Sequence, residues 1–186
     1  MELSQLIHDV KDSLTPHRFH HVEGVVQASI DLAKQYGVNA EQAEIAAWLH
    51  DIAREWSWEK LRVASQTIEV PPGFATIPTL LHGPIGAHIG KTHYGIDDEL
   101  ILDAVRYHTT GRPDMTALDM VLFVADAIEP GRDYAGVDQI RQAARRSLEW
   151  AVRLSIDNTI RFLVDAGKPL FPLTVLTRND LIMRSE

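Results

Sequence analysis

The segment Ile45–Arg54 is the feature that most constrains the fold. It is apolar almost all round, which is typical of a helix that neighbouring helices bury on every side. In helical steps, His50 stands on a stripe of small residues: Ala43, Ala46 and Ala47. Large helices can pack closely against such a stripe. We therefore predict a buried central helix over this segment.

Composition limits the chemistry that the chain can carry. There is no cysteine, so any metal must be held by histidine and carboxylate side chains. A net charge of −8 argues against a general nucleic-acid binder, and no apolar run is long enough to cross a membrane. No signal-peptide pattern opens the chain. We expect one cytoplasmic domain over residues 1–186. The sequence leaves open whether the protein forms a homodimer.

Helix signals recur along the chain, whereas strand signals are poor. Amphipathic helices are predicted over Glu2–Leu14 and Pro16–Tyr36, the second with Gly37 as its left-handed cap. Asn39 and Gln42 have the spacing of a capping box. Further helices are expected to begin at Ser57, after Gly83-Pro84, at Asp97 and at Thr116. The predicted fold is all-α.

The last third of the chain is predicted to contain one long helix over Val137–Ala166, bent near Arg146-Ser147. The arginines along it, Arg141 among them, are interpreted as a solvated face. Residues 168–174 contain two prolines and are expected to be extended, with a short final helix after Asn179.

Polar residues interrupt the apolar faces of several predicted helices. They are His21, His50, Asp51, His82, His108 and Asp126. A lone buried histidine is more often a satisfied core residue than a ligand, but six such residues without cysteine favour a shared metal site. Imidazole with carboxylate suits Fe, Mn, Co, Ni or Zn and does not choose between them. An ion held this way can lower the pKa of bound water and polarise a phosphoryl oxygen, which points to hydrolysis of an anion.

Five motifs with their flanking residues carry a more specific signal. They are HRFHHVEGV at 17–25, LHDIA at 49–53, LHGPIGA at 81–87, HTTG at 108–111 and ADAIEPGR at 125–132. In this order they resemble the HD-superfamily bacterial symmetrical bis(5'-nucleosyl)-tetraphosphatases, from about residue 17 to residue 179. The resemblance implies an HD-domain helical bundle that hydrolyses diadenosine tetraphosphate to two ADP, with iron as the expected metal.

The resemblance also implies roles for individual residues. The metal ligands would be His21, His50, Asp51 and Asp126. Asp51, His82 and His108 would be catalytic, the two histidines by binding phosphate, donating a proton or holding a second ion. Arg132, Phe171, Pro172 and Thr174 would contact the nucleotide. Arg18, Arg54 and Thr109 are further expected substrate contacts, since Arg18 lies one turn before His21 and Thr109 follows His108.

Three positions depart from the family pattern. Arg54 stands where lysine is usual, Arg178 stands where an aromatic residue usually precedes Asn179, and Ala127 lacks an aromatic side chain beside Asp126. These affect nucleotide contacts rather than the metal. Two alternatives therefore stay open: an HD hydrolase acting on a nucleoside mono- or triphosphate or a cyclic nucleotide, and a non-catalytic nucleotide sensor.

Overall fold

The computed structural model describes residues 2–184. The helices in the first half of the chain are α1 (Leu3–Ser13), α2 (Pro16–Tyr36), α3 (Ala40–Leu49), α4 (Trp58–Ser65) and α5 (His82–Tyr94). Those in the second half are α6 (Glu99–Tyr107), α7 (Ala117–Ile128), α8 (Val137–Ala144), α9 (Leu148–Asp165) and α10 (Pro172–Met183). Two short 3₁₀ turns, η1 (Phe74–Thr76) and η2 (Pro78–Leu80), precede α5. The described residues contain no strand, which confirms the all-α prediction.

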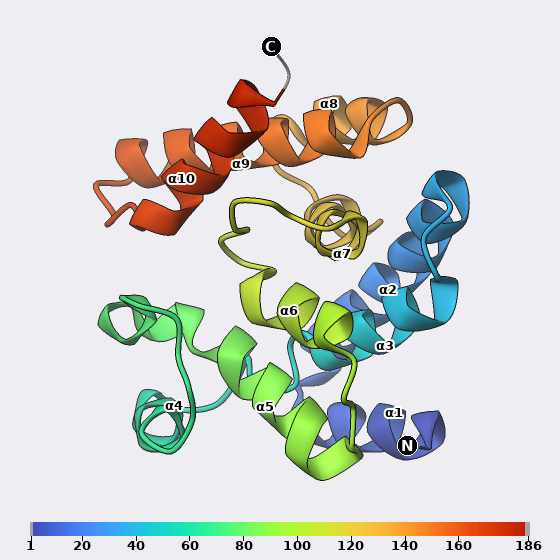
Figure 1. The fold of residues 1–186 in the computed structure, drawn as a ribbon, viewed down its shortest axis with the longest axis vertical. Helices are drawn as coiled ribbons and strands as arrows, with labels where there is room; N and C mark the ends of the chain where they lie inside the picture. Colours follow the sequence, from blue (N-terminus) through green and yellow to red (C-terminus); the bar gives the residue numbers. More distant parts are fainter. Residues whose placement is uncertain (1, 185–186) are drawn as a thin grey trace.

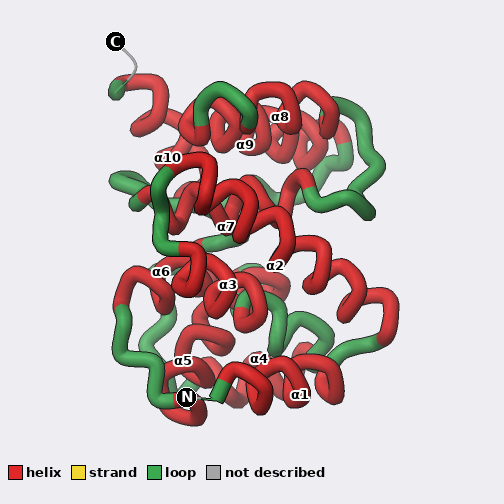
Figure 2. Tube along the Cα trace, turned by 90° about the vertical axis from the view of Figure 1, so that its right-hand side faces the viewer, coloured by secondary structure: helices red, strands yellow, loops and turns green. Residues whose placement is uncertain are grey.

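The helices are arranged in layers along the longest axis of the molecule (Figure 1). Helices α8, α9 and α10 form one end and α1, α4 and α5 the other, with α7 and then α2, α3 and α6 between them (Figure 2). No helix of the described residues combines the length and apolarity needed to span a bilayer.

Helix α2 has the predicted bounds because both of its ends carry strong local signals. The Thr15 side chain accepts a hydrogen bond from the Arg18 N–H at 3.4 Å, and Pro16 occupies the first helical position. At the other end Gly37 has φ = 68°, and its N–H donates to Ala33 O. Both ends of α2 are therefore set by local sequence.

The central helix ends earlier than predicted, at Leu49 instead of Arg54. Beyond Leu49 the chain continues in tight turns, in which Ile52 N donates to Leu49 O at 3.2 Å and Arg54 N donates to Asp51 O at 2.9 Å. On a regular helix, adjacent side chains point in different directions. The change to turns allows His50 and Asp51 to face the same space.

Two predicted caps also need correction. Asp98, not Asp97, caps α6, and its side chain accepts from Leu100 N at 2.9 Å. Asn39 caps α3 as predicted, but Gln42 does not close a capping box. Gln42 instead donates to Asp98 at 2.6 Å and so ties the start of α3 to the start of α6.

The C-terminal third differs most from the prediction. The expected long helix is two helices, because the chain breaks at 145–147 and Ser147 caps α9 by accepting from Trp150 N at 3.2 Å. Helix α10 begins at Pro172, within the segment expected to be extended. Proline is compatible with a first helical position, so it begins this helix instead of preventing it.

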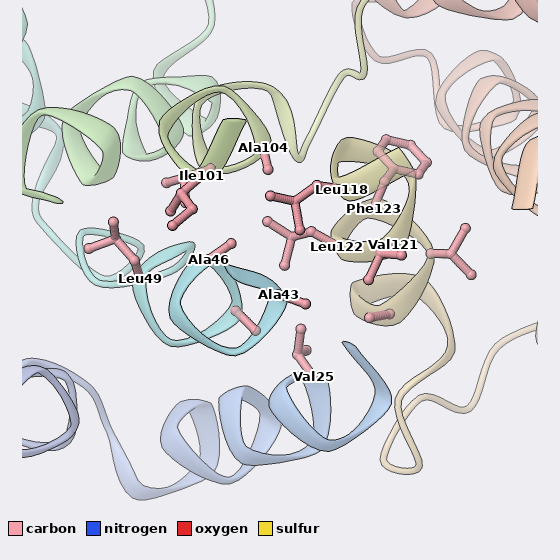
Figure 3. Packing of buried hydrophobic residues seen from close by; sticks show 14 of the residues in the cluster. Val25, Ala43, Ala46, Leu49, Ile101, Ala104, Leu118, Val121, Leu122 and Phe123 are labelled. Atoms are coloured by element: carbon pink, nitrogen blue, oxygen red, sulfur yellow. The ribbon is translucent and has the colours of Figure 1, made fainter. Parts of the chain in front are cut away.

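The core lies where α2, α3, α6 and α7 meet (Figure 3). Ala43 and Ala46 of α3 are fully buried, and Leu122 of α7 and Ala104 of α6 lie against this region. Small side chains on α3 let the surrounding helices approach closely, as the stripe of alanines predicted. Helix α3 contacts α1, α2, α5, α6 and α7, so helices surround it on most sides.

Candidate metal centre

The structure brings the six inward-facing residues into one cluster. His21 lies in α2, His50 and Asp51 directly follow α3, His82 begins α5, His108 directly follows α6, and Asp126 lies in α7. All are buried except Asp126, whose side chain is 22% exposed. Five chain segments therefore meet at one site.

Asp51 lies at the centre of the cluster. Its Oδ1 is 3.3 Å from His82 Nε2 and 3.8 Å from His108 Nε2. Its Oδ2 is 3.5 Å from His50 Nε2 and 3.9 Å from His21 Nε2. One carboxylate thus separates two pairs of imidazoles.

Each histidine is oriented by a hydrogen bond at its other ring nitrogen. The Nδ1 atoms of His50, His82 and His108 lie 2.6, 2.6 and 2.7 Å from the carbonyl oxygens three residues earlier in the chain. His21 Nδ1 lies 3.0 Å from Glu129 Oε1. Because a carbonyl can only accept, a neutral ring bonded in this way carries its proton on Nδ1. Its Nε2 lone pair then points into the cluster.

With the ring protons on Nδ1, the Nε2 atoms and carboxylate oxygens that face one another in the cluster are all hydrogen-bond acceptors. His82 Nε2 and His108 Nε2 are 3.0 Å apart, and His21 Nε2 is 3.1 Å from Asp126 Oδ1. His21 Nε2 and His50 Nε2 are buried without a hydrogen-bond partner. Buried acceptors this close need a cation or a proton between them.

A divalent metal fits this donor set. One ligand atom from each of His21, His50 and Asp126 lies within 4.8 Å of the others. The same holds for His50, Asp51 and His108. Imidazole nitrogen and carboxylate oxygen are common ligands of divalent transition metals.

The protonation states also suit a metal. Burial lowers the pKa of His50, and it lowers the pKa of His108 to about 3. Burial raises the pKa of Asp51, but the neighbouring imidazoles, His50 first, outweigh it and hold this pKa well below its usual range. At neutral pH His50 and His108 are therefore neutral imidazoles beside the ionised Asp51, the forms that bind metals.

Two arginines adjoin the cluster. Arg18 Nη1 donates to Asp51 Oδ2 at 3.2 Å, and Arg18 Nε is buried without a partner. Arg132 donates through Nη2 to Asp126 Oδ1 at 2.6 Å and through Nε to the Asp126 carbonyl at 2.8 Å. Arg54 is half-buried, and within residues 2–184 its guanidinium makes no hydrogen bond or ion pair.

A cavity of about 210 Å³ opens beside the cluster. Its walls include His108, Thr109, Asp126 and Arg132. Thr109 Oγ1 is buried without a hydrogen-bond partner, so it is free to contact a ligand. The sequence prediction missed other residues of this wall: Phe123, Tyr134, Ser155 and Thr159.

The predicted nucleotide contacts near the C-terminus lie at a different cavity. Phe171 and Pro172 line an apolar space of about 770 Å³ together with Tyr107 and Arg112. Tyr107 lines this larger cavity, and His108, the next residue in the chain, lines the smaller one. Thr174 is buried and does not line either space.

Two residues next to the cluster were not predicted to have a role. Glu129 is 4% exposed and contacts His21, although the sequence indicated only a helix end there. Arg141 was interpreted as part of a solvated face, which is wrong. Its guanidinium donates to the carbonyls of Ile128, Glu129 and Arg132. The signal for Glu129 was its position three residues after Asp126, on the same helical face.

Comparison with known proteins agrees with this geometry. A family model for the HD domain matches residues 18–131, which is more than half of the chain. The matched range contains all six residues of the cluster. The fold and the site therefore define an HD-domain protein.

Comparison with individual relatives identifies a more specific family among HD-domain proteins. A symmetrical bis(5'-nucleosyl)-tetraphosphatase of Bacillus subtilis is 43% identical over 95% of each chain. One of Halalkalibacterium halodurans is 39% identical, also over 95% of each chain. The crystal structure of a predicted HD superfamily hydrolase involved in NAD metabolism from Clostridium acetobutylicum superposes with a TM-score of 0.93, at 37% identity, covering 99% of this chain and 98% of that one. The chain belongs to the family of symmetrical bis(5'-nucleosyl)-tetraphosphatases.

Proposed function

We propose that this protein is a metal-dependent hydrolase that splits diadenosine tetraphosphate symmetrically into two ADP. The observation that carries the proposal is the buried convergence of four imidazole Nε2 atoms on two carboxylates. The names of the relatives, symmetrical bis(5'-nucleosyl)-tetraphosphatases, support the substrate and the position of cleavage.

The ion would be held by His21, His50, Asp51 and Asp126. Iron is our proposal for its identity, with Mn, Co, Ni and Zn as alternatives that the donor set also accepts. A second ion could lie on the Oδ1 side of Asp51, where His82 and His108 point. When bound, the metal lowers the pKa of water and polarises a phosphoryl oxygen.

The remaining groups act on the substrate phosphates. Arg18 and Arg132 supply the positive charge, because both lie at the cluster and both keep part of the side chain accessible, 25% and 34% exposed. The Thr109 hydroxyl can donate to a phosphate oxygen. His108 is neutral at pH 7, since burial holds its pKa at about 3, and its Nε2 is then an acceptor, so we assign it to ion binding and not to proton donation or direct phosphate contact.

The apolar cavity at Phe171 and Pro172 would take a nucleoside. Its volume of about 770 Å³ and its walls of proline, leucine and aromatic side chains suit a base and ribose. Arg112 at its edge stacks on Tyr107, with the guanidinium 5.2 Å from the ring centre. Thr174 and Arg54 stay weaker candidates for substrate contact, since neither lines this cavity or the smaller one.

A nucleotide panel tests the proposal. Purified protein supplied in turn with Fe²⁺, Mn²⁺ or Co²⁺ should convert diadenosine tetraphosphate to ADP alone. Nucleoside mono- and triphosphates and cyclic nucleotides should react far more slowly. Faster turnover of one of those would replace the substrate assignment. Tight binding of the dinucleotide without turnover under every metal would indicate a sensor.

We also propose that residues 1–186 fold as one HD-type domain and that the protein acts in the cytoplasm. A shared core from α1 to α10 supports the first statement. A single cooperative unfolding transition followed by several probes would test it, and cell fractionation would test the second.

A further inference from the structure

Glu129 is a buried carboxylate. One of its oxygens contacts a nitrogen of an imidazole ring, and the other accepts from a backbone N–H. It directly follows α7, and Oε1 lies 3.0 Å from His21 Nδ1. Oε2 accepts a hydrogen bond from the Gly131 N–H at 2.5 Å. A buried carboxylate is costly unless its oxygens are satisfied, and here each has a nitrogen partner.

Two glycines leave room for this carboxylate. A Cβ atom added at Gly24, inside α2, would lie 2.7 Å from Glu129 Oε2, and one at Gly131 would lie 3.0 Å from the same atom. Glycine inside a helix costs about 1 kcal/mol relative to alanine. Close approach of the Glu129 carboxylate to α2 accounts for a glycine at position 24.

The backbone of Glu129 is held as firmly as its side chain. Arg141 donates from Nη2 to Glu129 O at 3.1 Å and to Arg132 O at 2.9 Å, and from Nε to Ile128 O at 3.1 Å. One guanidinium therefore holds both sides of the turn that carries the carboxylate. Glu129 reaches His21 from a fixed position.

His21 needs a side-chain acceptor, unlike the other three histidines. His50 and His108 directly follow helices and His82 begins one, so each can donate to a carbonyl three residues earlier. His21 lies within α2, where the backbone carbonyls accept the bonds of the helix. Glu129 takes the place of the missing carbonyl.

We propose that Glu129 is a positioning residue that keeps the neutral His21 ring protonated on Nδ1, with the Nε2 lone pair directed at Asp51 and Asp126. The statement that Nε2 binds a divalent metal rests on the proposed function, whereas the tautomer and orientation of the ring do not. A carboxylate is required because both Oε1 and Oε2 must accept. An amide has one acceptor, so Glu129→Gln forces its NH₂ group towards Gly131 N–H or towards His21 Nδ1. In the second case the ring turns to the other tautomer and its Nε2 no longer binds a metal.

The first measurement is metal affinity, with Co²⁺ titrated against a chromophoric chelator. Glu129→Gln should bind Co²⁺ about tenfold or more weakly than the unaltered protein, as is usual when the partner of a metal-binding histidine is lost. Glu23→Gln makes the same chemical change on exposed α2 surface and should leave the affinity unchanged. Equal affinity in a folded Glu129→Gln protein whose His21 proton has moved to Nε2 would overturn the proposal. Equal affinity with the proton still on Nδ1 would mean that the amide oxygen keeps the bond to His21, and the variant described next then decides.

The second variant, Gly24→Ala, displaces the carboxylate without changing any charge. Alanine favours the helix, which offsets part of the cost of overpacking, and the added methyl group should push Glu129 off His21 and weaken Co²⁺ binding. Unchanged affinity in a folded Gly24→Ala protein would count against a positioning role. If the Glu129→Gln protein does not fold, the Co²⁺ affinity of Gly24→Ala tests the positioning role by itself.

The third measurement needs no metal. In the metal-free protein at alkaline pH, where the ring is neutral, ¹⁵N chemical shifts should place the His21 proton on Nδ1 in the unaltered protein and in Glu23→Gln. A proton on Nε2 in the unaltered protein would overturn the inference. If the unaltered protein takes up no Co²⁺, the proposed function fails, but the ¹⁵N shifts still decide the role of Glu129.

Discussion

At the scale of single residues, the site depends on acceptors that face one another inside an apolar core. Burial raises the pKa of Asp126, and the contacts with His21 and Arg132 outweigh it and lower this pKa below its usual range. The pKa of His21 is raised, since the carboxylates of Asp126 and Glu129 outweigh the opposing effect of burial. This charge pairing involves only His21, Asp126, Glu129 and Arg132, and it leaves His50 Nε2 without a hydrogen-bond partner.

Replacement of Asp126 tests its expected role as a ligand. Asp126→Asn keeps the shape of the side chain and removes its charge, so we expect a folded protein whose metal affinity and activity fall by about a hundredfold or more. His20→Ala, one residue from His21 but exposed and paired with Glu23 on the surface of α2, should change neither. Elemental analysis and the ADP assay measure both. An active Asp126→Asn protein with full metal content would remove Asp126 from the ligand set.

Which residues face inward could be predicted, and which contacts they make could not. His21 and Asp126 interrupt apolar helical stripes, so periodicity alone placed them in the interior. Arg141 gave no such signal, because an arginine on a polar face is usually solvated. Glu129 shares the helical face of Asp126, but a carboxylate at a helix end is also usually solvated. Their partners, His21 and three carbonyls, come together only through tertiary packing.

At the scale of helices, the site is built from ends brought close together by small residues. His82 begins α5 and His108 follows α6, and these two helices pack side by side. Gly83 lies at this contact, where an added Cβ would stand 2.8 Å from Arg106 O and 3.0 Å from Val105 O. The separation of the two histidines therefore depends on a glycine.

A methyl group at this contact should destabilise the protein. Gly83→Ala favours helix formation but forces backbone atoms apart, and overpacking of this kind costs about 1–3 kcal/mol in the free energy of unfolding. His88→Ala, at an exposed position of the same helix, should cost little. Urea denaturation compares the two. A Gly83→Ala protein as stable as His88→Ala would show that α5 and α6 can separate freely.

Helix boundaries were predictable where short-range signals set them. Thr15-Pro16 and Gly37 gave both ends of α2. The early end of α3 was not predicted from its apolar sequence, and the early start of α10 was missed because Pro172 was interpreted as a signal of extended chain, although proline also suits a first helical position. Phe171, just before α10, packs on Phe74 with ring centres 5.2 Å apart, a contact between residues nearly a hundred positions apart in the chain.

At the scale of the whole molecule, the metal would link three chain segments at the centre of the bundle. His21 lies in α2, His50 and Asp51 directly follow α3, and Asp126 lies in α7, while a second ion at His82 and His108 would add the start of α5 and the end of α6. An ion that binds these groups only in the folded state stabilises that state by mass action.

Removal of the metal should therefore lower the melting temperature. A hundredfold excess of ion over its dissociation constant contributes about 2.7 kcal/mol. For a chain of this length that corresponds to roughly 5–10 °C. Calorimetry before and after chelation measures the shift, and re-addition of the ion should reverse it. An unchanged melting temperature after proven removal would mean that the ion does not link these helices.

The position of cleavage tests the central claim most directly. Water is the expected nucleophile, because the chain has no cysteine and no serine or threonine in an obvious nucleophile motif. Hydrolysis of diadenosine tetraphosphate in ¹⁸O-labelled water should give ADP as the only product, with one heavy oxygen shared per pair of ADP molecules, read by mass spectrometry. ATP and AMP as primary products would place the attack on another phosphorus and would contradict symmetrical cleavage, even with the HD fold intact.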